Sequence, residues 1–460
     1  MTSITPARIF VPMALLFGCL LVIATPPLQS PDEYNHFFRA FQISEGNFYP
    51  KKLNGNRLGE DLPVSLYAFK TAFTPMIYDY GSRTSYSEMK SVLALSLQPQ
   101  YKEFTDFPNT AIYAPTSYLP QALGIFFARY FTDRVLLLFY AARLFNLVCW
   151  IFLVWAALRL MPFQRQTMAA LALLPASLAI AASCSADVFS NGLAFYAIAF
   201  FCRECTLNVG EKAKSTNYAF GATMIVALNK LVFVPLALLS LLKEFRRKID
   251  WKIFLRPALM PLLLCFAVAV WWGVKANEWF IPYDKYDQEV RHLQTLNPGV
   301  NPSEQISFVF SNLFSFVKTV AVSVIRTAPS TAAHLVGKFG WEKNYLPVWM
   351  LALLWMALII LVFSEKNMLN PYQRVWLSGI ILCCIILWAL TMYALWCPVG
   401  APELDNWQGR YFVPLAPLIT MAIGVGWGQR LEKNNTVFSL MILVSGEAML
   451  IYNVLARYWL

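Results

Sequence analysis

The stretch VLLLFYAARLFNLVCWIFLVWAAL, residues 135–158, holds one charged side chain, Arg143, among apolar neighbours. A helix needs about 20 apolar residues to cross the roughly 30 Å of hydrocarbon in a bilayer, so this stretch predicts a membrane span. The composition agrees: of 460 residues 58% are hydrophobic and 14% are charged, whereas soluble domains carry roughly 25% charge. These numbers exclude a soluble multidomain protein and predict an all-α integral membrane protein.

Apolar runs on both sides of this stretch predict about eleven transmembrane helices in a single polytopic domain, residues 1–460. The first run, Ile9 to Ala24, is interpreted as an uncleaved anchor because Thr25-Pro26-Pro27 is a poor cleavage site. The other predicted spans are 135–158, 167–184, 188–207, 257–275, 346–363, 374–397, 411–428 and 436–456. Residues 217–242 are interrupted by Asn229 and Lys230, which predicts a shallow hairpin with its tip toward the outer face.

Basic residues assign the two sides of the membrane. The loop 243–256 contains six basic residues and two acids, and the positive-inside rule places such a loop in the cytoplasm, together with the N-terminus. This assignment makes 27–134 the first periplasmic loop, with juxtamembrane helices, and 276–345 the second. We expect outward-facing interfacial helices at 111–130 and 306–326. The net charge of +11 is then explained by topology and lipid headgroups, not by nucleic acid.

Cysteines and histidines indicate no metal or disulfide framework. Eight of the nine cysteines lie in or at apolar runs, where Cys behaves as a small hydrophobe. The three histidines are too scattered for a zinc triad, and there is no phosphate-binding loop or dinucleotide turn. The sequence therefore requires no cofactor. It leaves open a divalent cation at the acids Asp32 or Glu33.

The sharpest polar cluster is Ser-Pro-Asp-Glu-Tyr-Asn-His, residues 30–36, directly after the first span. His36 follows Asp32 by four residues, so the two side chains share one helix face, and Arg39 lies one turn further. One interpretation is structural, with Asp32 as a helix N-cap and Glu33 in the first turn. The other is chemical: a carboxylate near a membrane surface, with Arg and His beside it, suits a general base that acts near a phosphate.

Further candidates lie at the predicted outer ends of later spans. Arg143 needs either a buried partner or a route for its guanidinium to the interface, and Lys230 is either a phosphate ligand or a solvated turn. Asp187 suits an N-cap slightly better than a site. In Gln408-Gly409-Arg410-Tyr411 the Arg suits a phosphate and the Tyr a sugar, although aromatic residues also form ordinary membrane belts. Trp341 after Gly340 is a weaker candidate.

The sequence resembles a bacterial membrane-protein family defined by a domain of unknown function, over nearly its whole length. The matching residues begin with Pro31-Asp32-Glu33, His36 and Arg39 and end with Gln408-Gly409-Arg410-Tyr411-Phe412. Between them lie Tyr118, Gln121, Arg143, Asp187, Lys230 and Trp341. That family is similar to the GT-C superfamily of glycosyltransferases, which take sugars from polyprenyl phosphates.

The resemblance implies a function and roles. It implies catalysis by Asp32, with Glu33 second, and donor-phosphate binding by Arg39, Arg143, Lys230 and Arg410. The residues implied in sugar or acceptor binding are His36, Tyr118, Gln121, Asp187, Trp341, Gln408 and Tyr411. The expected reaction moves a hexose such as glucose from undecaprenyl phosphate to a hydroxyl of a periplasmic glycan, such as lipid-linked O-antigen, at the periplasmic face of the bacterial inner membrane.

Two alternatives remain open from the residues. The first is a transporter or flippase of lipid-linked sugars, although such proteins usually show repeats and broken helices at mid-membrane and this sequence shows no repeat. The second is a glycan polymerase or ligase that uses a lipid-diphosphate donor.

Overall fold

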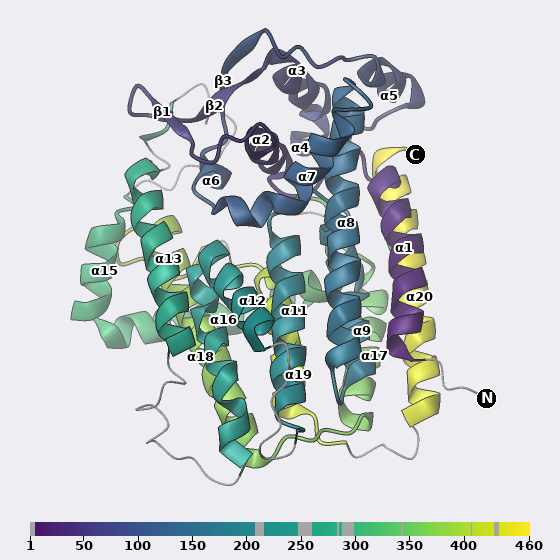
Figure 1. Cartoon of the computed structure of the whole chain (residues 1–460), viewed down its shortest axis with the longest axis vertical. Helices are drawn as coiled ribbons and strands as arrows, with labels where there is room; N and C mark the ends of the chain where they lie inside the picture. Colours follow the sequence, from purple (N-terminus) through teal and green to yellow (C-terminus); the bar gives the residue numbers. More distant parts are fainter. Residues whose placement is uncertain are drawn as a thin grey trace.

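The computed structural model describes residues 5–207, 216–246, 260–282, 285–287, 299–341, 344–405, 407–426 and 432–460. In this part of the chain, helices stand side by side in a bundle, and a smaller folded unit covers one end of it (Figure 1). We call this unit, residues 27–134, the cap. The fold is largely helical, as predicted, but the cap also contains a small sheet.

Four described helices are long and apolar enough to cross a membrane. They are α1 (Pro6–Ala24), α8 (Val135–Leu160), α18 (Pro371–Trp396) and α20 (Glu432–Tyr458). A fifth arises if α15 (Pro302–Ser311) and α16 (Leu313–Gly337), bent by 106°, count as one span. The prediction of about eleven spans is therefore not supported in the described part of the chain.

The difference arises because several apolar runs form helices that are short or carry charges. Residues 167–184 are divided into α9 (Arg165–Ala172) and α10 (Pro175–Ala181), since Pro175 has no N–H to continue the first helix. The 188–207 run is α11 (Asp187–Glu204), with charged residues at both ends. The remaining runs form α13 (Met260–Trp279), α17 (Val348–Ser364), and η6 (Gly409–Leu415) followed by α19 (Ala416–Ile423).

The predicted interruption at Asn229–Lys230 is confirmed. Helix α12 (Thr216–Asn229) ends there, and the 3-10 helix η2 (Leu231–Arg246) begins one residue later and packs against α12. The Thr116 hydroxyl of the cap donates to Asn229 Oδ1 at 2.5 Å, which holds the break at the capped end of the bundle. Most of the basic loop 243–256 lies outside the described residues, from 247 onward.

The cap is a folded unit, whereas the sequence was interpreted as a loop too poor in apolar residues for a core. Its helices are α2 (Glu33–Ser44), α3 (Val64–Phe73), α4 (Pro75–Tyr78), α5 (Tyr86–Leu93), α6 (Pro108–Ala111), η1 (Pro115–Tyr118) and α7 (Leu119–Ala128). Strands β1 (Lys51–Leu53), β2 (Arg57–Pro63) and β3 (Lys102–Asp106) form an antiparallel sheet in that order. Phe37 and Phe69 of the cap pack against Phe139 of α8, so cap and bundle share one core.

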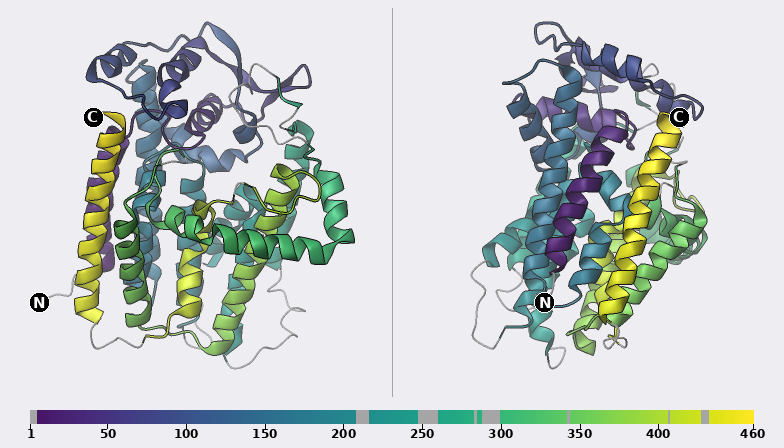
Figure 2. Two further views of the ribbon diagram at one scale, coloured as in Figure 1. Left: turned by 180° about the vertical axis from the view of Figure 1, so that it is seen from behind. Right: turned by 90° about the vertical axis from the view of Figure 1, so that its right-hand side faces the viewer.

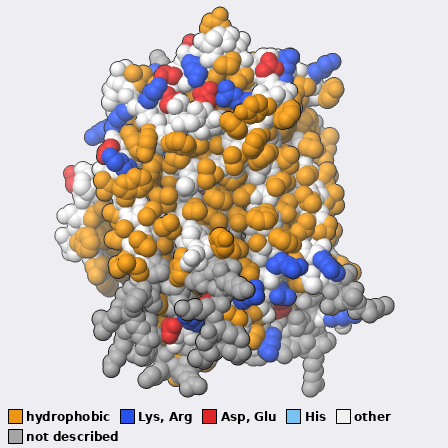
Figure 3. Space-filling view, in the orientation of Figure 1, with side chains coloured by type: hydrophobic (Ala, Val, Ile, Leu, Met, Phe, Trp, Pro, Cys, Tyr) orange, Lys and Arg blue, Asp and Glu red, His pale blue; other side chains and the backbone are white. Residues whose placement is uncertain are grey.

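The surface shows how the molecule suits a bilayer. In Figure 3 a broad apolar band separates two ends that carry most of the charged side chains. Helix α7 packs along α8, and α16 crosses the bundle rather than running along it (Figure 2). Exposed apolar side chains, such as Phe127 on α7 and Phe314 on α16, are compatible with the predicted interfacial positions.

Candidate active site

Asp32 occupies the N-cap position of α2, but its side chain makes no capping hydrogen bond. Its backbone is left-handed, with φ of 57°, a conformation that costs a non-glycine residue on the order of 1–3 kcal/mol and often marks functional sites. Asn109 Nδ2 donates to Asp32 Oδ1 at 3.1 Å, and Arg410 Nη2 lies 3.8 Å from Oδ2. Asp32 thus has the N-cap position that the structural interpretation expected, but its side chain does not cap the helix, and the carboxylate, 36% exposed, faces a cation.

A second ion pair joins Asp187 to Lys230. Lys230 occupies the break between α12 and η2, and its Nζ lies 2.5 Å from Asp187 Oδ1. Asp187 is the first residue of α11 and Ala186 is the N-cap, so the N-cap interpretation of Asp187 is wrong. The ammonium lies over two aromatic rings, 5.4 Å from the centroid of Trp388 and 5.6 Å from that of Tyr411.

Tyr411 connects the two ion pairs. The guanidinium carbon of Arg410 lies 5.4 Å from the centroid of the Tyr411 ring, which also contacts Lys230. Arg410 Nε is buried and has no hydrogen-bond partner among the described residues. Because an unpaired buried donor is costly, this N–H suits an anionic ligand.

A small cavity of about 40 Å³ lies beside Arg410, which is room for about three water molecules. Ala176, Ala179 and Ile180 of α10 form its apolar wall, and Arg410 and Gln408 line it from η6 and the segment before it. The remaining lining comes from the residues that precede α2 and from the end of α16 and the turn after it: Ser30, Pro31, His334, Lys338, Phe339 and Gly340. The cavity therefore has a cationic side and an apolar side.

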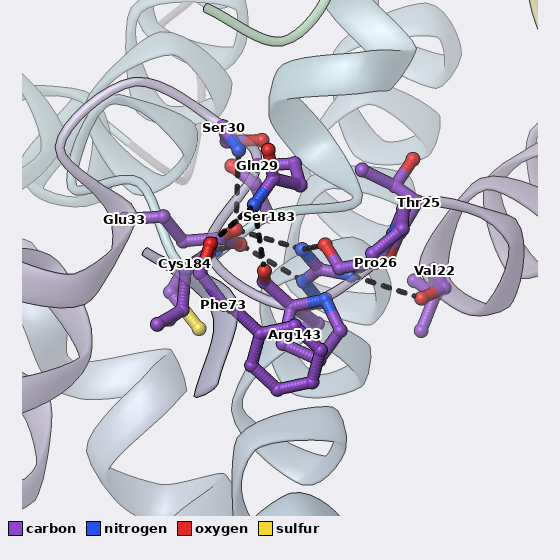
Figure 4. A network of polar contacts seen from close by, with 12 residues as sticks. Val22, Thr25, Pro26, Gln29, Ser30, Glu33, Phe73, Arg143, Ser183 and Cys184 are labelled. Carbon is purple, nitrogen blue, oxygen red and sulfur yellow. Dashed lines mark hydrogen bonds and ion pairs between the residues drawn. The ribbon is translucent and has the colours of Figure 1, made fainter. Parts of the chain in front are cut away.

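Glu33 and Arg143 form a closed, fully buried pair (Figure 4). Arg143 Nε and Nη2 donate to the two Glu33 oxygens at 2.8 and 2.7 Å. The other three N–H groups of Arg143 donate to the carbonyl oxygens of Val22, Thr25 and Pro26. Since Arg has five N–H donors, none remains for a phosphate.

Glu33 is equally occupied, since it also accepts from the backbone N–H groups of Ser30 and Cys184. The roles expected for Glu33 in catalysis and Arg143 in phosphate binding therefore need correction. The pair holds the segment that carries Asp32 between α1 and α8, because charges buried this completely are stable only when paired and hydrogen-bonded.

His36 lies within electrostatic reach of both ion pairs but is uncharged at neutral pH. Its pKa is lowered to about 3, chiefly by burial; the charge of Asp187 opposes this shift, and the positive charges of Arg410 and Lys230 add to it. Its Nδ1 is 2.9 Å from the hydroxyl of Tyr118, whose pKa burial raises. His36 is thus a neutral hydrogen-bonding group there, which leaves its expected part in sugar binding a prediction.

Comparison with known families agrees with this membrane architecture. Residues 15–419 match the model of the family DUF2142, described as predicted membrane protein. The chain belongs to the DUF2142 family. No curated protein and no solved structure matches it. The roles of the residues in this DUF2142 member are therefore argued from its geometry.

Two other candidates in this DUF2142 member make structural contacts. Arg39 is fully buried and donates to Gln42 and to the carbonyl oxygens of Phe48 and Tyr113. These contacts hold the cap together, while Arg39 Nε has no hydrogen-bond partner among the described residues, and its expected role in phosphate binding stays a prediction. Gln121 donates to the carbonyl oxygens of Cys184 and Ser185, which positions the turn before Asp187.

Trp341 and Gln408 lie at the edge of the site. Trp341 Nε1 donates to the carbonyl of Leu28 at 3.2 Å, and its ring stacks on Tyr34 with centroids 6.4 Å apart. Gln408 lines the cavity next to Arg410. Their roles in sugar or acceptor binding stay predictions.

Sequence reasoning missed three residues of this site. Asn109 carries no motif, and only the folding of the cap brings it to Asp32. Trp388 lies inside an apolar helix, where an aromatic residue has no distinguishing signal. Lys338 lines the cavity and was hidden in the second predicted loop. The described residues contain no group of three His, Cys, Asp or Glu side chains suited to a metal ion.

Proposed function

We propose that this protein is a GT-C-type glycosyltransferase that moves a sugar from a polyprenyl phosphate to a hydroxyl of a glycan. One observation carries the proposal. Asp32 is held in a strained conformation that turns its carboxylate from the helix end toward Arg410, beside the Lys230–Asp187 pair. A carboxylate and two cations from distant parts of the sequence thus lie together at one end of the bundle.

The proposed reaction uses each group once. The acceptor oxygen forms a bond to the anomeric carbon of the donor sugar while the bond from that carbon to the phosphate oxygen breaks. Asp32 accepts the hydroxyl proton as a general base. The polyprenyl phosphate departs with the bonding electrons, and Arg410 and Lys230 stabilise the charge that develops on it. Tyr411 lies against both cations and keeps them apart from bulk water.

The charge distribution supports an external site. Arg159 lies in the last turn of α8 and Arg165 is the first residue of α9, while Lys366 follows α17 and Arg374 lies in the first turn of α18; all four are at the end of the bundle opposite the cap (Figure 1). The positive-inside rule favours the cytoplasm for this end, which supports our proposal that the cap and Asp32 face the periplasm at a bacterial inner membrane. The lipid tail then enters past the interfacial helices α7 and α16, and the glycan arrives from the aqueous side.

Asp32→Asn tests the proposal because it keeps the side-chain size and tolerates left-handed backbone while removing the base. The assay follows transfer of labelled hexose from undecaprenyl-phosphate-glucose into glycan in membranes of the host bacterium, which supply the acceptor. We expect the rate to fall by about 10²–10⁴-fold, the usual contribution of a general base.

Asp133→Asn is the matched control, since Asp133 is an exposed carboxylate on the cap, 64% accessible and paired only with its neighbour Arg134. It should keep the normal rate. Full activity of Asp32→Asn would remove Asp32 from catalysis. If the unmodified protein does not consume undecaprenyl-phosphate-glucose, the result would argue for one of the two alternatives, a transporter or flippase, or an enzyme that uses a lipid-diphosphate donor.

A further inference from the structure

An aromatic and cationic cluster lies next to Asp32 on the cap, apart from the phosphate side of the site. Tyr34, two residues after Asp32, stacks on Trp341. The ammonium of Lys70, on α3, lies 4.7 Å from the centroid of the Tyr34 ring and 5.4 Å from that of Tyr67. We call Tyr34, Tyr67, Lys70, Tyr78 and Trp341 the aromatic cluster.

The cluster is open to solvent on one side. Tyr34 is buried and forms its floor, whereas Tyr67 is 56% exposed and Tyr78 is 48% exposed. The charge of Asp32 contributes to raising the pKa of Tyr78, after the larger effect of burial, so Tyr78 lies within electrostatic reach of the proposed base. A ligand lying across these rings can therefore approach Asp32 from the aqueous side.

Lys70 is a cation without an anionic partner in the described part of the chain. Its ammonium makes no ion pair and no side-chain hydrogen bond there, and only the two tyrosine rings face it. Burial lowers the pKa of Lys70, and the single charge that opposes this effect is that of Asp106. Asp106 itself is bound by Arg57 at 2.5 Å. The ammonium of Lys70 can therefore bind an anionic group of a ligand.

Sugar rings and anions fit these two features. The faces of Tyr and Trp rings carry partial negative charge, and the C–H groups of a pyranose, which carry partial positive charge, pack on such faces. A half-buried ammonium with unused donors forms charge-assisted hydrogen bonds to a carboxylate or phosphate. The cluster offers both kinds of contact, and its Tyr34 lies two residues after the proposed base, Asp32.

We propose that the aromatic cluster is the acceptor subsite, and that it selects an acidic glycan, one whose sugars carry a carboxylate or a phosphate. This inference rests on the proposed function. Tyr67, Tyr78 and Trp341 pack against the sugar rings, and Lys70 binds the anionic group. The next hydroxyl along the glycan is then presented to Asp32.

The test measures binding without a donor, using the purified full chain in lipid nanodiscs. The probes are a tetrasaccharide of alternating glucuronic acid and N-acetylglucosamine, a neutral N-acetylglucosamine tetrasaccharide, and a phosphomannose-containing oligosaccharide. We expect at least one acidic probe to bind about tenfold more tightly than the neutral one. The two acidic probes distinguish a carboxylate from a phosphate as the preferred anion.

Substitutions identify the residues responsible. Lys70→Met should remove the tenfold preference and leave the neutral probe unchanged, and Lys70→Arg should retain the preference. Tyr67→Ala should weaken the binding of all three probes. The controls are Lys90→Met and Tyr86→Ala on α5, both exposed and outside the cluster, and they should change nothing. An unchanged thermal unfolding midpoint for each variant shows that the cap still folds.

Three results would overturn the inference: equal binding of acidic and neutral probes, an unchanged preference in Lys70→Met, or no binding of any probe. Failure of the proposed function is separate. Acidic probes that bind through Lys70, in a protein that transfers no sugar from undecaprenyl-phosphate-glucose, would support the glycan subsite and reject the transferase.

Discussion

Asp32 and Glu33 are adjacent, chemically alike and placed in entirely different surroundings. Asp32 is partly exposed, makes one hydrogen bond to Asn109 and faces Arg410. Glu33 is fully buried and its oxygens are occupied by Arg143 and two backbone N–H groups. The left-handed backbone of Asp32 separates the two carboxylates: that of Asp32 faces Arg410, whereas that of Glu33 faces Arg143.

Arg143→Met tests the structural role of the Glu33–Arg143 pair. Removing the guanidinium leaves Glu33 as an uncompensated buried charge, which costs about 3–5 kcal/mol. The expected result is a marked fall in the thermal unfolding midpoint of the purified protein. The control Arg159→Met removes an exposed Arg from the last turn of the same helix and should change the midpoint little.

A double variant, Glu33→Gln with Arg143→Met, should recover part of the loss because it leaves no unpaired charge. An unchanged unfolding midpoint in Arg143→Met would show that the pair is not structural and would return Arg143 to the candidates for phosphate binding.

The sequence singled out Asp32 and Arg410, which the fold brings within 3.8 Å of each other, but it did not show the contacts of each neighbour. A motif shows which residue types occur together, whereas the φ angle of Asp32 and the partners of Arg143 depend on segments far away in the chain. In the sequence, Arg143 therefore could not be distinguished from a phosphate ligand, because both occur as a lone charged residue in an apolar helix. The structure distinguishes the two by filling all five donors.

At the scale of elements, breaks in helices position the site. Lys230 lies where α12 ends, Asp187 begins α11, and Arg410 lies at the start of η6. The sequence predicted the break at Lys230 because polar residues interrupt an apolar run. It overestimated the number of spans because hydropathy alone does not show where a proline such as Pro175 divides a run into short helices.

Gly409→Ala tests how η6 positions Arg410. A Cβ at Gly409 would meet the carbonyl oxygen of Thr331 and lie 2.6 Å from His334 Cβ and 2.8 Å from Leu335 N, all on α16. Because two of these atoms belong to backbone, η6 must move and Arg410 with it. We expect sugar transfer to fall at least tenfold, with a stability loss of about 1–3 kcal/mol typical of overpacking.

The control is Gly379→Ala on α18, where an added Cβ meets nothing within 4 Å, so both the transfer rate and the unfolding midpoint should stay normal. Normal transfer in Gly409→Ala would mean that the close packing of η6 on α16 does not set the position of Arg410.

At the scale of the whole molecule, the packing of the cap on the bundle brings the site residues together. Asp32 and Asn109 belong to the cap or its entry, whereas Lys230 and Arg410 come from the bundle. The composition predicted a helical membrane protein, and family membership agrees with it. The folded cap could not be predicted from apolar runs, since its core is completed by α8, a distant part of the chain.

The most direct test of the account is a double-mutant cycle on sugar transfer with Asp32→Asn, Arg410→Gln and the two combined. Residues that act as one unit lose activity non-additively. We therefore predict that the combined variant is about as slow as the slower single variant, whereas Asp32→Asn combined with the control Arg134→Gln multiplies their separate effects. Losses for Asp32 and Arg410 that multiply, or a normal rate in either single variant, would contradict a shared site.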